Sequence, residues 1–314
     1  MKKRANVGGQ AVIEGVMMRG SKGLATAVRK SDGEIEVKFE DTKPLTKKNK
    51  IFSLPVIRGF ISLVDSLIIG IKSLNYSASF FEEEGEPSKF DKWLENLFKE
   101  KTNDIIMGFS LVLSLGFSVL LFFLLPTYAA NIFKRLDINN TIILNIIEGV
   151  IRVTIFIVYI LLIGKMNDIN RVFQYHGAEH KSIFCYENEE DLTPENAKKY
   201  KRFHPRCGTN FMFLVMIVSI IVFSLTGWDS VIQRTISRIV LLPVISGITY
   251  EIIKWMGKSE SDIAKVLAYP GLSLQKLTTR EPDESQLEVA IKALKVAEGL
   301  EEVPKPEEVK LEIV

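Results

Sequence analysis

The three histidines of the chain, His176, His180 and His204, stand close together in a sequence of 314 residues. The first two frame the pentapeptide His-Gly-Ala-Glu-His, in which Glu179 directly precedes His180. If this segment is helical, residues four positions apart lie about 40° from each other on one face, so both imidazoles can reach one cation. In a His-x-x-Glu-His metal site the carboxylate takes a proton from the attacking water. The sequence therefore predicts His176 and His180 as metal ligands and Glu179 as a catalytic general base.

A second pair of candidate ligands follows in the segment His204-Pro-Arg-Cys207. An imidazole and a thiolate at this spacing suit zinc, which prefers nitrogen and sulfur ligands. Three imidazoles and one thiolate would make a closed, structural site, whereas a catalytic zinc keeps one position open for water. One of His204, Cys207 or Glu251 could complete a catalytic set of three. Glu251 is the alternative ligand, because metallopeptidases with this motif take a third ligand from a glutamate on a later helix.

Apolar and charged residues, at 47% and 25% of the chain, are segregated along it. Four apolar stretches are long enough to cross a bilayer, and the last of them is interrupted by polar residues. They cover residues 105–125, 141–164, 211–227 and 239–256. We therefore expect a mainly α-helical, polytopic membrane protein with about four spans. The basic N-terminus lacks a continuous apolar region, so no cleavable signal peptide is expected.

Lysines and arginines are concentrated in the segment 165–210, whereas the loops 126–140 and 228–238 carry two basic residues each. The positive-inside rule then places this segment and both termini in the cytoplasm, with the protein in the plasma membrane. Cys185 and Cys207 would face a reducing compartment, so no disulfide is expected. Cys185 falls on the opposite side of the predicted helix from His176, which predicts a small buried side chain.

The N-terminal segment is predicted to form a small β-rich cytoplasmic unit. Residues 24–30 and 34–40 alternate apolar and polar side chains around an Asp-Gly turn. The glycine-rich segment 8–20 lacks the spacing of a phosphate-binding loop, which favours a close-packed strand. Arg58, Asp65 and Lys72 form a charged stripe on an otherwise apolar helix, which indicates a helix in the membrane interface or packed into the bundle.

These patterns divide the chain into six segments. They are a β-rich unit (1–50), interfacial helices and a linker (51–104), two spans (105–164), a metal-site loop (165–210), two further spans (211–256), and C-terminal helices with a tail (257–314).

Charged residues inside and beside the spans have two possible roles. Glu148 and Arg152 are four positions apart in the second span, and an ion pair within the bundle is expected. Lys181 and the basic run 198–202 could contact anionic lipid headgroups, although basic flanks are also ordinary topology signals. The lipid bilayer, and with it anionic lipids or membrane proteins, are the expected partners. No pattern indicates a nucleic-acid partner.

The chain resembles a family of bacterial multipass membrane proteins that is classed as a domain of unknown function and described as predicted metal-dependent enzymes. Four motifs carry the resemblance, and together they cover nearly the whole chain. They are residues 8–20, Gln-Tyr-His-Gly-Ala-Glu-His-Lys at 174–181, His-Pro-Arg-Cys-Gly-Thr-Asn at 204–210, and residues 279–291. The resemblance implies a metal site built from His176, Glu179, His180, His204 and Cys207, but supplies no substrate.

Three functions compete on the sequence alone. The first is a membrane-embedded, zinc-dependent hydrolase at the cytoplasmic surface, acting on a membrane peptide, a lipid or an isoprenoid derivative. The second is a scaffold or biogenesis factor in which a structural zinc staples the cytoplasmic loop. The third is a transporter, which the small number of spans and the lack of an internal repeat disfavour. The Glu in the His-x-x-Glu-His motif favours the enzyme, because a staple has no need of a carboxylate there.

Overall fold

The fold is described from a computed structural model, which describes residues 7–42, 44–81, 102–136, 140–205, 207–225, 230–259 and 261–302. The chain forms two compact units. The first, here called the sheet unit, combines Met1–Phe81, Leu162–Phe213 and Ser246–Val314. The second, the helical unit, combines Glu82–Leu161 and Leu214–Ile245.

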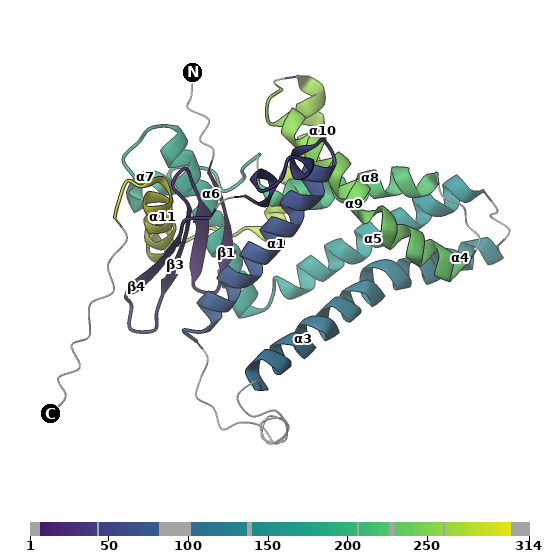
Figure 1. Cartoon of the computed structure of the whole chain (residues 1–314), viewed down its shortest axis with the longest axis horizontal. Coiled ribbons are helices and arrows are strands. Elements are labelled where there is room, and N and C mark those ends of the chain that lie inside the picture. The colour runs from purple at the N-terminus through teal and green to yellow at the C-terminus, as the bar shows by residue number, and fades with distance from the viewer. Residues whose placement is uncertain are drawn as a thin grey trace. The chain divides into compact units, whose positions relative to one another are not determined.

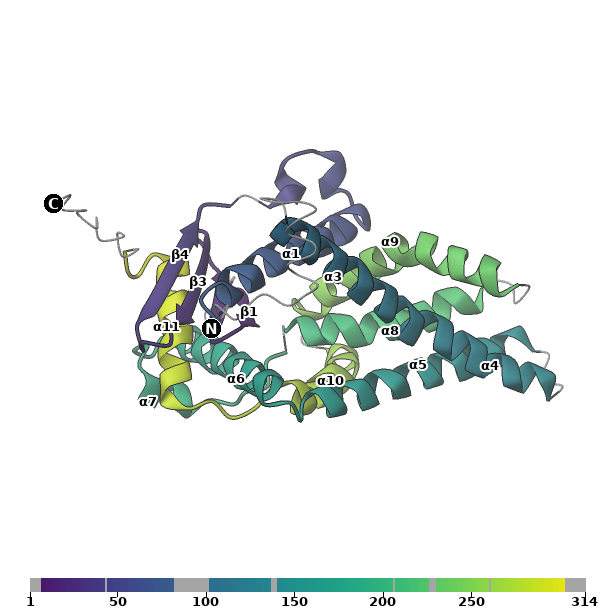
Figure 2. The ribbon, with the colours of Figure 1, turned by 90° about the horizontal axis from the view of Figure 1, so that it is seen from below.

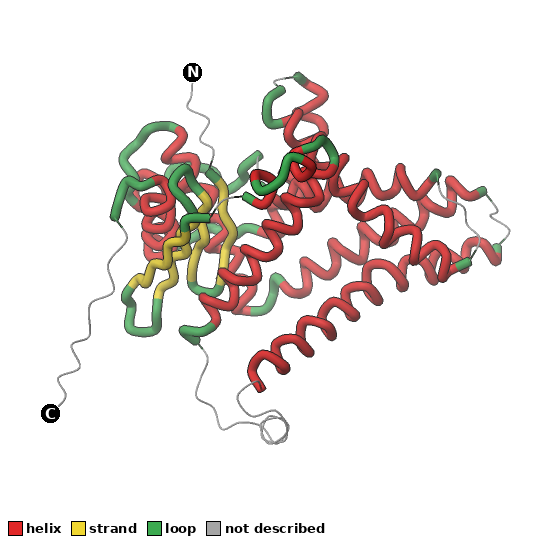
Figure 3. The backbone as a smooth tube through the Cα atoms, in the orientation of Figure 1, coloured by secondary structure: helices red, strands yellow, loops and turns green. Residues whose placement is uncertain are grey.

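The sheet unit contains a four-stranded antiparallel sheet in the order β1-β2-β3-β4 (Figures 1 and 3). Its strands are β1 (Gly8–Val12), β2 (Gly15–Arg19), β3 (Leu24–Arg29) and β4 (Ile35–Glu40). The predicted turn between the last two strands is confirmed, and Gly33 adopts φ +90°, which favours glycine. The glycine-rich segment forms the β1–β2 hairpin, as expected from its lack of a phosphate-loop spacing.

Side chains alternate between the two faces of this sheet. Val16, Met18, Ala25 and Ala27 face a buried core that also contains residues of helices α6 (Asn167–Glu187) and α11 (Glu284–Glu298). The opposite face meets helix α1 (Ile57–Ala78), where Ser73 accepts a hydrogen bond from Thr26 at 3.4 Å. The sheet is therefore covered by α6 and α11 on one face and by α1 on the other (Figures 1 and 2).

Helix α1 has an inverted distribution of side chains. The residues that it buries are small, namely Gly59, Gly70, Ser73 and Ser77. Large apolar side chains such as Leu67, which is 56% exposed, and Ile71, which is 44% exposed, point away from the sheet. The charged stripe finds partners: Arg58 pairs with Glu251, and Asp65 lies 3.2 Å from Arg19. The apolar side chains of α1 are therefore largely left on its exposed face.

The remaining elements of the sheet unit are two short turns, one short helix and one long helix. Two 3-10 turns, η1 (Leu45–Lys47) and η2 (Ile51–Ser53), precede α1, and α7 (Pro194–Lys198) follows α6. Helix α10 (Asp262–Thr278) leads into α11, which begins with a capping box formed by Asp283 and Gln286. The sheet unit thus joins the predicted β-rich segment, the metal-site loop and the C-terminal helices.

The helical unit is built from apolar helices. Helix α3 (Thr102–Val119) runs through a π-helical turn (Leu120–Leu124) into α4 (Leu125–Arg135), and α5 (Thr141–Ile163), α8 (Gly208–Ser224) and α9 (Val231–Met256) follow. Among the described residues, three helices are long and apolar enough to cross a membrane: Gly108–Lys134, Thr141–Ile163 and Ile232–Met256. Helix α8, the third predicted span, is apolar but has only 17 residues. The mainly helical fold is confirmed, with three long apolar helices in place of four.

A buried polar cluster joins three helices of this unit. Glu148 accepts hydrogen bonds from Arg152 at 2.7 Å, from Arg238 at 2.7 Å and from Thr127 at 3.1 Å. Arg152 also donates to the carbonyl of Phe122 in the π-helical turn. The expected ion pair is present. The predicted loop 228–238 is too long, because helix α9 already begins at Val231. Arg238 therefore lies inside the helix, where its guanidinium donates to Glu148.

Candidate metal centre

Helix α6 carries the His-x-x-Glu-His motif on its buried side. The rings of His176 and His180 lie edge to face with centroids 4.5 Å apart, as expected for residues four positions apart on one helix. Cys185 lies on the other side of the helix and is fully buried in the core. Burial raises the pKa of the Cys185 thiol to about 11, so it remains protonated at neutral pH.

Hydrogen bonds to backbone carbonyls orient both histidines. Nδ1 of His176 donates to the carbonyl of Thr278 at 2.9 Å, and Nδ1 of His180 donates to the carbonyl of Arg202 at 2.5 Å. Because a carbonyl can only accept, Nδ1 carries the proton and Nε2 presents its lone pair. This is the arrangement commonly found behind metal-bound histidines.

Cys207 brings a sulfur ligand to the same point. Its Sγ lies 3.1 Å from Nε2 of His176, and candidate ligand atoms of His176, His180 and Cys207 all lie within 4.8 Å of one another. Thr209, in the first turn of α8, directs its backbone N–H at 3.5 Å and its hydroxyl at 3.1 Å toward the sulfur. Nε2 of His180 is buried and has no hydrogen-bond partner in the described part of the chain. A buried lone pair of this kind beside two further donor atoms fits a metal ion.

His204 lies beside this three-ligand cluster and is not part of it. Its ring centroid is 5.7 Å from that of His180. The side-chain amide of Gln275 clamps its backbone, since Oε1 accepts from the His204 N–H at 2.7 Å and Nε2 donates to the His204 carbonyl at 2.8 Å. Burial lowers the pKa of His204 to about 4, so the imidazole is neutral at physiological pH. Nε2 of His204 lies 3.6 Å from Oε2 of Glu187, and the neutral ring forms no ion pair with this carboxylate at that pH.

Glu179 is buried and binds the sheet. Its Oε1 accepts a hydrogen bond from the backbone N–H of Gly9 at 2.9 Å. A side chain at Gly9 would come within 3.2 Å of Cγ of Glu179 and 2.4 Å of the Met17 carbonyl, so glycine allows this close approach. The contact holds α6 against β1.

Glu251, the alternative ligand, is placed elsewhere. Both of its carboxylate oxygens accept hydrogen bonds from Arg58, at 2.6 and 2.5 Å. It does not belong to the three-ligand cluster of the described residues.

A cleft of about 790 Å³ opens onto the cluster. Glu179, His180, His204 and Cys207 line it together with residues of β1 and α1. This volume lies in the range typical of small-molecule and substrate sites. Two of the three cluster residues, His180 and Cys207, thus share one cavity with the candidate base Glu179.

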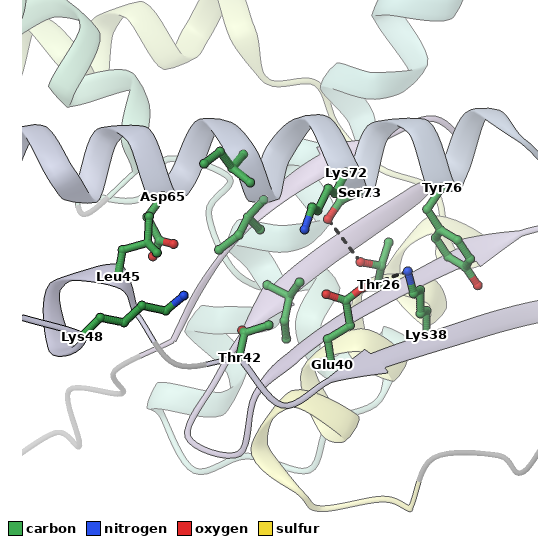
Figure 4. A pocket seen from close by; sticks show the side chains of 13 residues that line it. Thr26, Lys38, Glu40, Thr42, Leu45, Lys48, Asp65, Lys72, Ser73 and Tyr76 are labelled. Carbon is green, nitrogen blue, oxygen red and sulfur yellow. Dashed lines mark hydrogen bonds and ion pairs between the residues drawn. The ribbon is translucent and has the colours of Figure 1, made fainter. Parts of the chain in front are cut away.

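A second, smaller cavity of about 180 Å³ lies between α1 and the sheet (Figure 4). Three lysines and two acidic residues line it: Lys38, Lys48, Lys72, Glu40 and Asp65. Lys38 pairs with Glu40 at 2.8 Å. None of the metal-cluster residues lines this cavity, so it is separate from the metal centre.

Three of the basic residues expected at lipid headgroups, Lys181, Lys198 and Arg202, have acidic partners within the sheet unit. Lys181 is buried and pairs with Glu281, which also lies 3.7 Å from Arg202. Lys198 pairs with Glu284 at 2.8 Å. These two carboxylates offset part of the local positive charge, and the lipid contact remains a prediction.

Sequence reasoning missed the residues that support the centre. Gln275 and the carbonyl of Thr278 lie on α10, about 70 to 100 positions from the segments that they hold. Sequence periodicity marks apolar residues as buried and gives no sign that a glutamine such as Gln275 is buried. The sequence did carry a signal for Gly9, because a glycine-rich motif often marks a place where another segment approaches the backbone closely.

The structure combines a sheet unit that holds a His-His-Cys cluster with helices apolar enough to cross a membrane, which defines a class of candidate metal-binding membrane proteins. The family profile "Protein of unknown function (DUF1385)" matches residues 54–299, and the chain belongs to this family. A relative from Bacillus subtilis (strain 168), "Uncharacterized protein YqhQ", is 38% identical over 292 residues, covering 91% of this chain and 90% of its own length. No solved structure matches the chain.

Proposed function

We propose that the protein is a zinc-dependent hydrolase of the plasma membrane whose metal is held by His176, His180 and Cys207. The observation that carries the proposal is the buried, unpartnered Nε2 of His180 beside the His176–Cys207 contact. Three protein ligands leave a fourth position of a tetrahedral zinc open, as catalytic sites do. His180 and Cys207 line a cleft, which would give a substrate access to the metal.

The donor set fits zinc in type and in scale. Two imidazole nitrogens and one thiolate suit a borderline-soft ion. Zinc–nitrogen and zinc–sulfur bonds of the usual lengths place N and S about 3.6 Å apart in a tetrahedron. The observed 3.1 Å requires only a small rotation of either side chain.

Zinc at this position would act as a Lewis acid and make a bound water more acidic. Glu179 lines the same cleft and is the general base of the proposal: its carboxylate accepts a proton from water and returns it to the leaving group. Hydrolysis then adds OH to the attacked carbon or phosphorus and H to the departing atom, so that one water is consumed for each bond broken. The Gly9 hydrogen bond fixes Glu179 in the cleft.

Two other functions fit the site less well. A structural zinc in a scaffold protein calls for a fourth protein ligand, yet His204 stands outside the three-ligand cluster. A thiol–imidazole pair of Cys207 and His176 would account for the 3.1 Å contact, but it leaves His180 without a role.

The membrane location and topology belong to the same proposal. Four crossings, with the shorter α8 as the third, would keep both termini and the metal centre in the cytoplasm. Substrates at that surface would be a membrane peptide, a lipid or an isoprenoid derivative.

The substitution Glu179→Gln tests the proposal. Because the amide still accepts the Gly9 hydrogen bond but cannot take a proton, zinc content and protein level should stay normal. Complementation of the growth defect that accompanies deletion should be lost, with activity lower by roughly 10² to 10⁴. Glu190→Gln, at an exposed carboxylate just beyond α6, is the control and should complement fully. Full complementation by Glu179→Gln would favour the scaffold.

A further inference from the structure

We propose that the substrate carries a phosphate group on an apolar chain, and that Arg19, Lys22 and Lys47 bind this phosphate in the cleft of the metal centre. The inference rests on the proposed hydrolytic function and narrows its substrates to phosphorylated lipids and isoprenoid phosphates. It comes from one juxtaposition: three cationic side chains line the same cleft as the general base and two of the proposed metal ligands.

Arg19 ends β2 at the register position opposite Gly8 of β1. The next residue of β1, Gly9, donates its backbone N–H to Glu179. Arg19 and the general base are therefore attached to adjacent residue pairs of one hairpin. The side chain of Arg19 is one-third exposed and lines the cleft.

The guanidinium of Arg19 has unused hydrogen-bonding capacity. A guanidinium carries five N–H donors. Among the residues that the structure describes, Nη1 bonds to Asp65 at 3.2 Å, and Nη2 is buried without a partner. A purely structural arginine would be expected to place both Nη atoms on the two oxygens of its carboxylate partner. The protein itself thus leaves this guanidinium incompletely bonded.

Lys22 and Lys47 add positive charge to the same cleft. Both are exposed, and neither has an ion-pair partner in the part of the chain that the structure describes. Asp41 and Glu179 are the acidic side chains among the described lining residues, so the cations outnumber the carboxylates. A zinc ion held by a single thiolate would add further positive charge. A cleft with this balance attracts an anion.

A phosphate group suits this set of cations better than a peptide or a carboxylate does. Its several oxygens can accept hydrogen bonds from more than one cation at the same time. Arginine binds such oxygens through its planar N–H donors, and lysine binds them as a point charge. A peptide bond carries no charge and would leave the three cations without a counter-ion.

Helix α1 provides apolar contacts for a chain attached to the phosphate. Ser66 and Ile69 of this helix line the cleft. Leu67 and Ile71, on the same helix, expose large apolar side chains. An acyl or isoprenoid chain that covered them would remove apolar surface from water. This favours a lipid-borne phosphate over a soluble phosphate ester.

Radiolabelled inorganic phosphate tests the cation site. Equilibrium dialysis with zinc-loaded, full-length protein in detergent should show saturable binding. We expect Arg19→Gln to raise the dissociation constant about tenfold or more, because a charge-assisted hydrogen bond is lost. Arg29→Gln is the matched control. Arg29 also pairs with a carboxylate on a helix, Glu288 at 2.6 Å, but does not line the cleft, so this variant should bind phosphate normally.

A pair of lysine substitutions guards against a folding defect in Arg19→Gln. Lys22→Gln combined with Lys47→Gln changes only exposed side chains and should raise the dissociation constant for phosphate about threefold or more. Lys50→Gln combined with Lys265→Gln removes the same charge from exposed positions outside the lining. This control pair should leave phosphate binding unchanged.

Lipid and soluble phosphates can be compared as competitors of labelled phosphate on the Glu179→Gln protein, which should not turn them over. Phosphatidic acid in detergent micelles should displace phosphate at a lower concentration than glycerophosphate does. Displacement by glycerophosphate at an equal or lower concentration would overturn the apolar chain.

Two results would overturn the cation site. One is the absence of phosphate binding. The other is binding that ignores Arg19→Gln and the lysine pair but disappears without His176 and His180, which would place the phosphate on zinc. The proposed hydrolase would survive both results. Conversely, full complementation by Glu179→Gln with intact, Arg19-dependent phosphate binding would overturn the hydrolase and leave the phosphate site.

Discussion

Nε2 of His176 lies 3.1 Å from Sγ of Cys207, although 31 positions separate the two residues. One belongs to the middle of α6 and the other to the turn before α8. The contact therefore exists only when the segment between them has folded back. The carbonyl of Thr278 orients the imidazole of His176, and the backbone N–H of Thr209 is directed at the sulfur of Cys207.

Replacement of both helical histidines should remove the metal. We expect the purified protein to hold about one zinc, and His176→Ala combined with His180→Ala to hold none, since a single thiolate cannot retain the ion. Elemental analysis by mass spectrometry measures this. Cys185→Ala should keep its zinc, because that thiol lies on the other side of the helix. Full occupancy in the double variant would show that the metal binds elsewhere.

The two cysteines should differ in their reaction with iodoacetamide. Burial raises the pKa of Cys185 to about 11, so at pH 8 only about one molecule in a thousand carries the reactive thiolate. After chelation, Cys207 should be alkylated and Cys185 spared, while zinc should protect Cys207. Peptide mass spectrometry separates the two sites, and unfolded protein should label at both. Equal labelling of native Cys185 would contradict its burial.

Gln275→Ala should weaken zinc binding without removing a ligand. The amide fixes both backbone groups of His204, and the Cys207 N–H in turn donates to the His204 carbonyl at 3.3 Å. Loss of this support should raise the dissociation constant for zinc about 10- to 100-fold, as measured by competition with a chelator. Gln286→Ala is the control, a buried glutamine that caps α11 and contacts α6 at Gln174, without a hydrogen bond to a ligand residue. A similar loss of affinity in both variants would indicate general destabilisation.

Gly271→Ala should disturb the turn that carries Cys207. A Cβ at this position would overlap Oδ1 of Asn210, whose amide donates to the Pro205 carbonyl at 2.5 Å. We expect a loss of about 1–3 kcal/mol in the free energy of unfolding, together with weaker zinc binding. At Gly257 the nearest atom to an added Cβ is 3.4 Å away, so Gly257→Ala should be tolerated. Thermal unfolding in detergent compares the two.

Glu148→Gln should destabilise the helical unit. Arg152 and Arg238 both donate to this carboxylate, and neutralising it leaves two buried cations without their counter-charge. The expected cost is about 3–5 kcal/mol. Thr154→Ala, at an exposed position on the same helix, should change little. Thermal unfolding and the amount of protein in membranes provide the measurements, and an unaltered melting temperature for Glu148→Gln would argue against the cluster.

Local patterns were sufficient to predict the parts of the centre that lie on one element. The spacing of His176 and His180 predicted a shared face of α6, and the turn containing Gly33 predicted the β3–β4 hairpin. Both follow from short-range periodicity and backbone preference. The burial of Cys185 followed from the same helical arithmetic.

Contacts between distant segments could not be predicted in this way. Sequence spacing placed Glu251 among the ligands, but the structure pairs it with Arg58. Hydropathy began the last apolar stretch at residue 239 and so left Arg234 and Arg238 in the preceding loop. Only the fold shows that Glu148 supplies a partner to Arg238.

In the proposed membrane topology, the composition of the sheet unit constrains how the chain crosses the bilayer. Its three segments, 1–81, 162–213 and 246–314, pack into one body, so the parts of them outside the proposed spans lie on the same side of the membrane. Each excursion between them must then cross an even number of times. The first excursion contains the α3–α4 and α5 pair, and the second satisfies this parity only if α8 crosses together with α9. Seventeen residues extend about 26 Å against a hydrocarbon core of about 30 Å, so a crossing by α8 would require local thinning of the bilayer or snorkelling of the flanking residues.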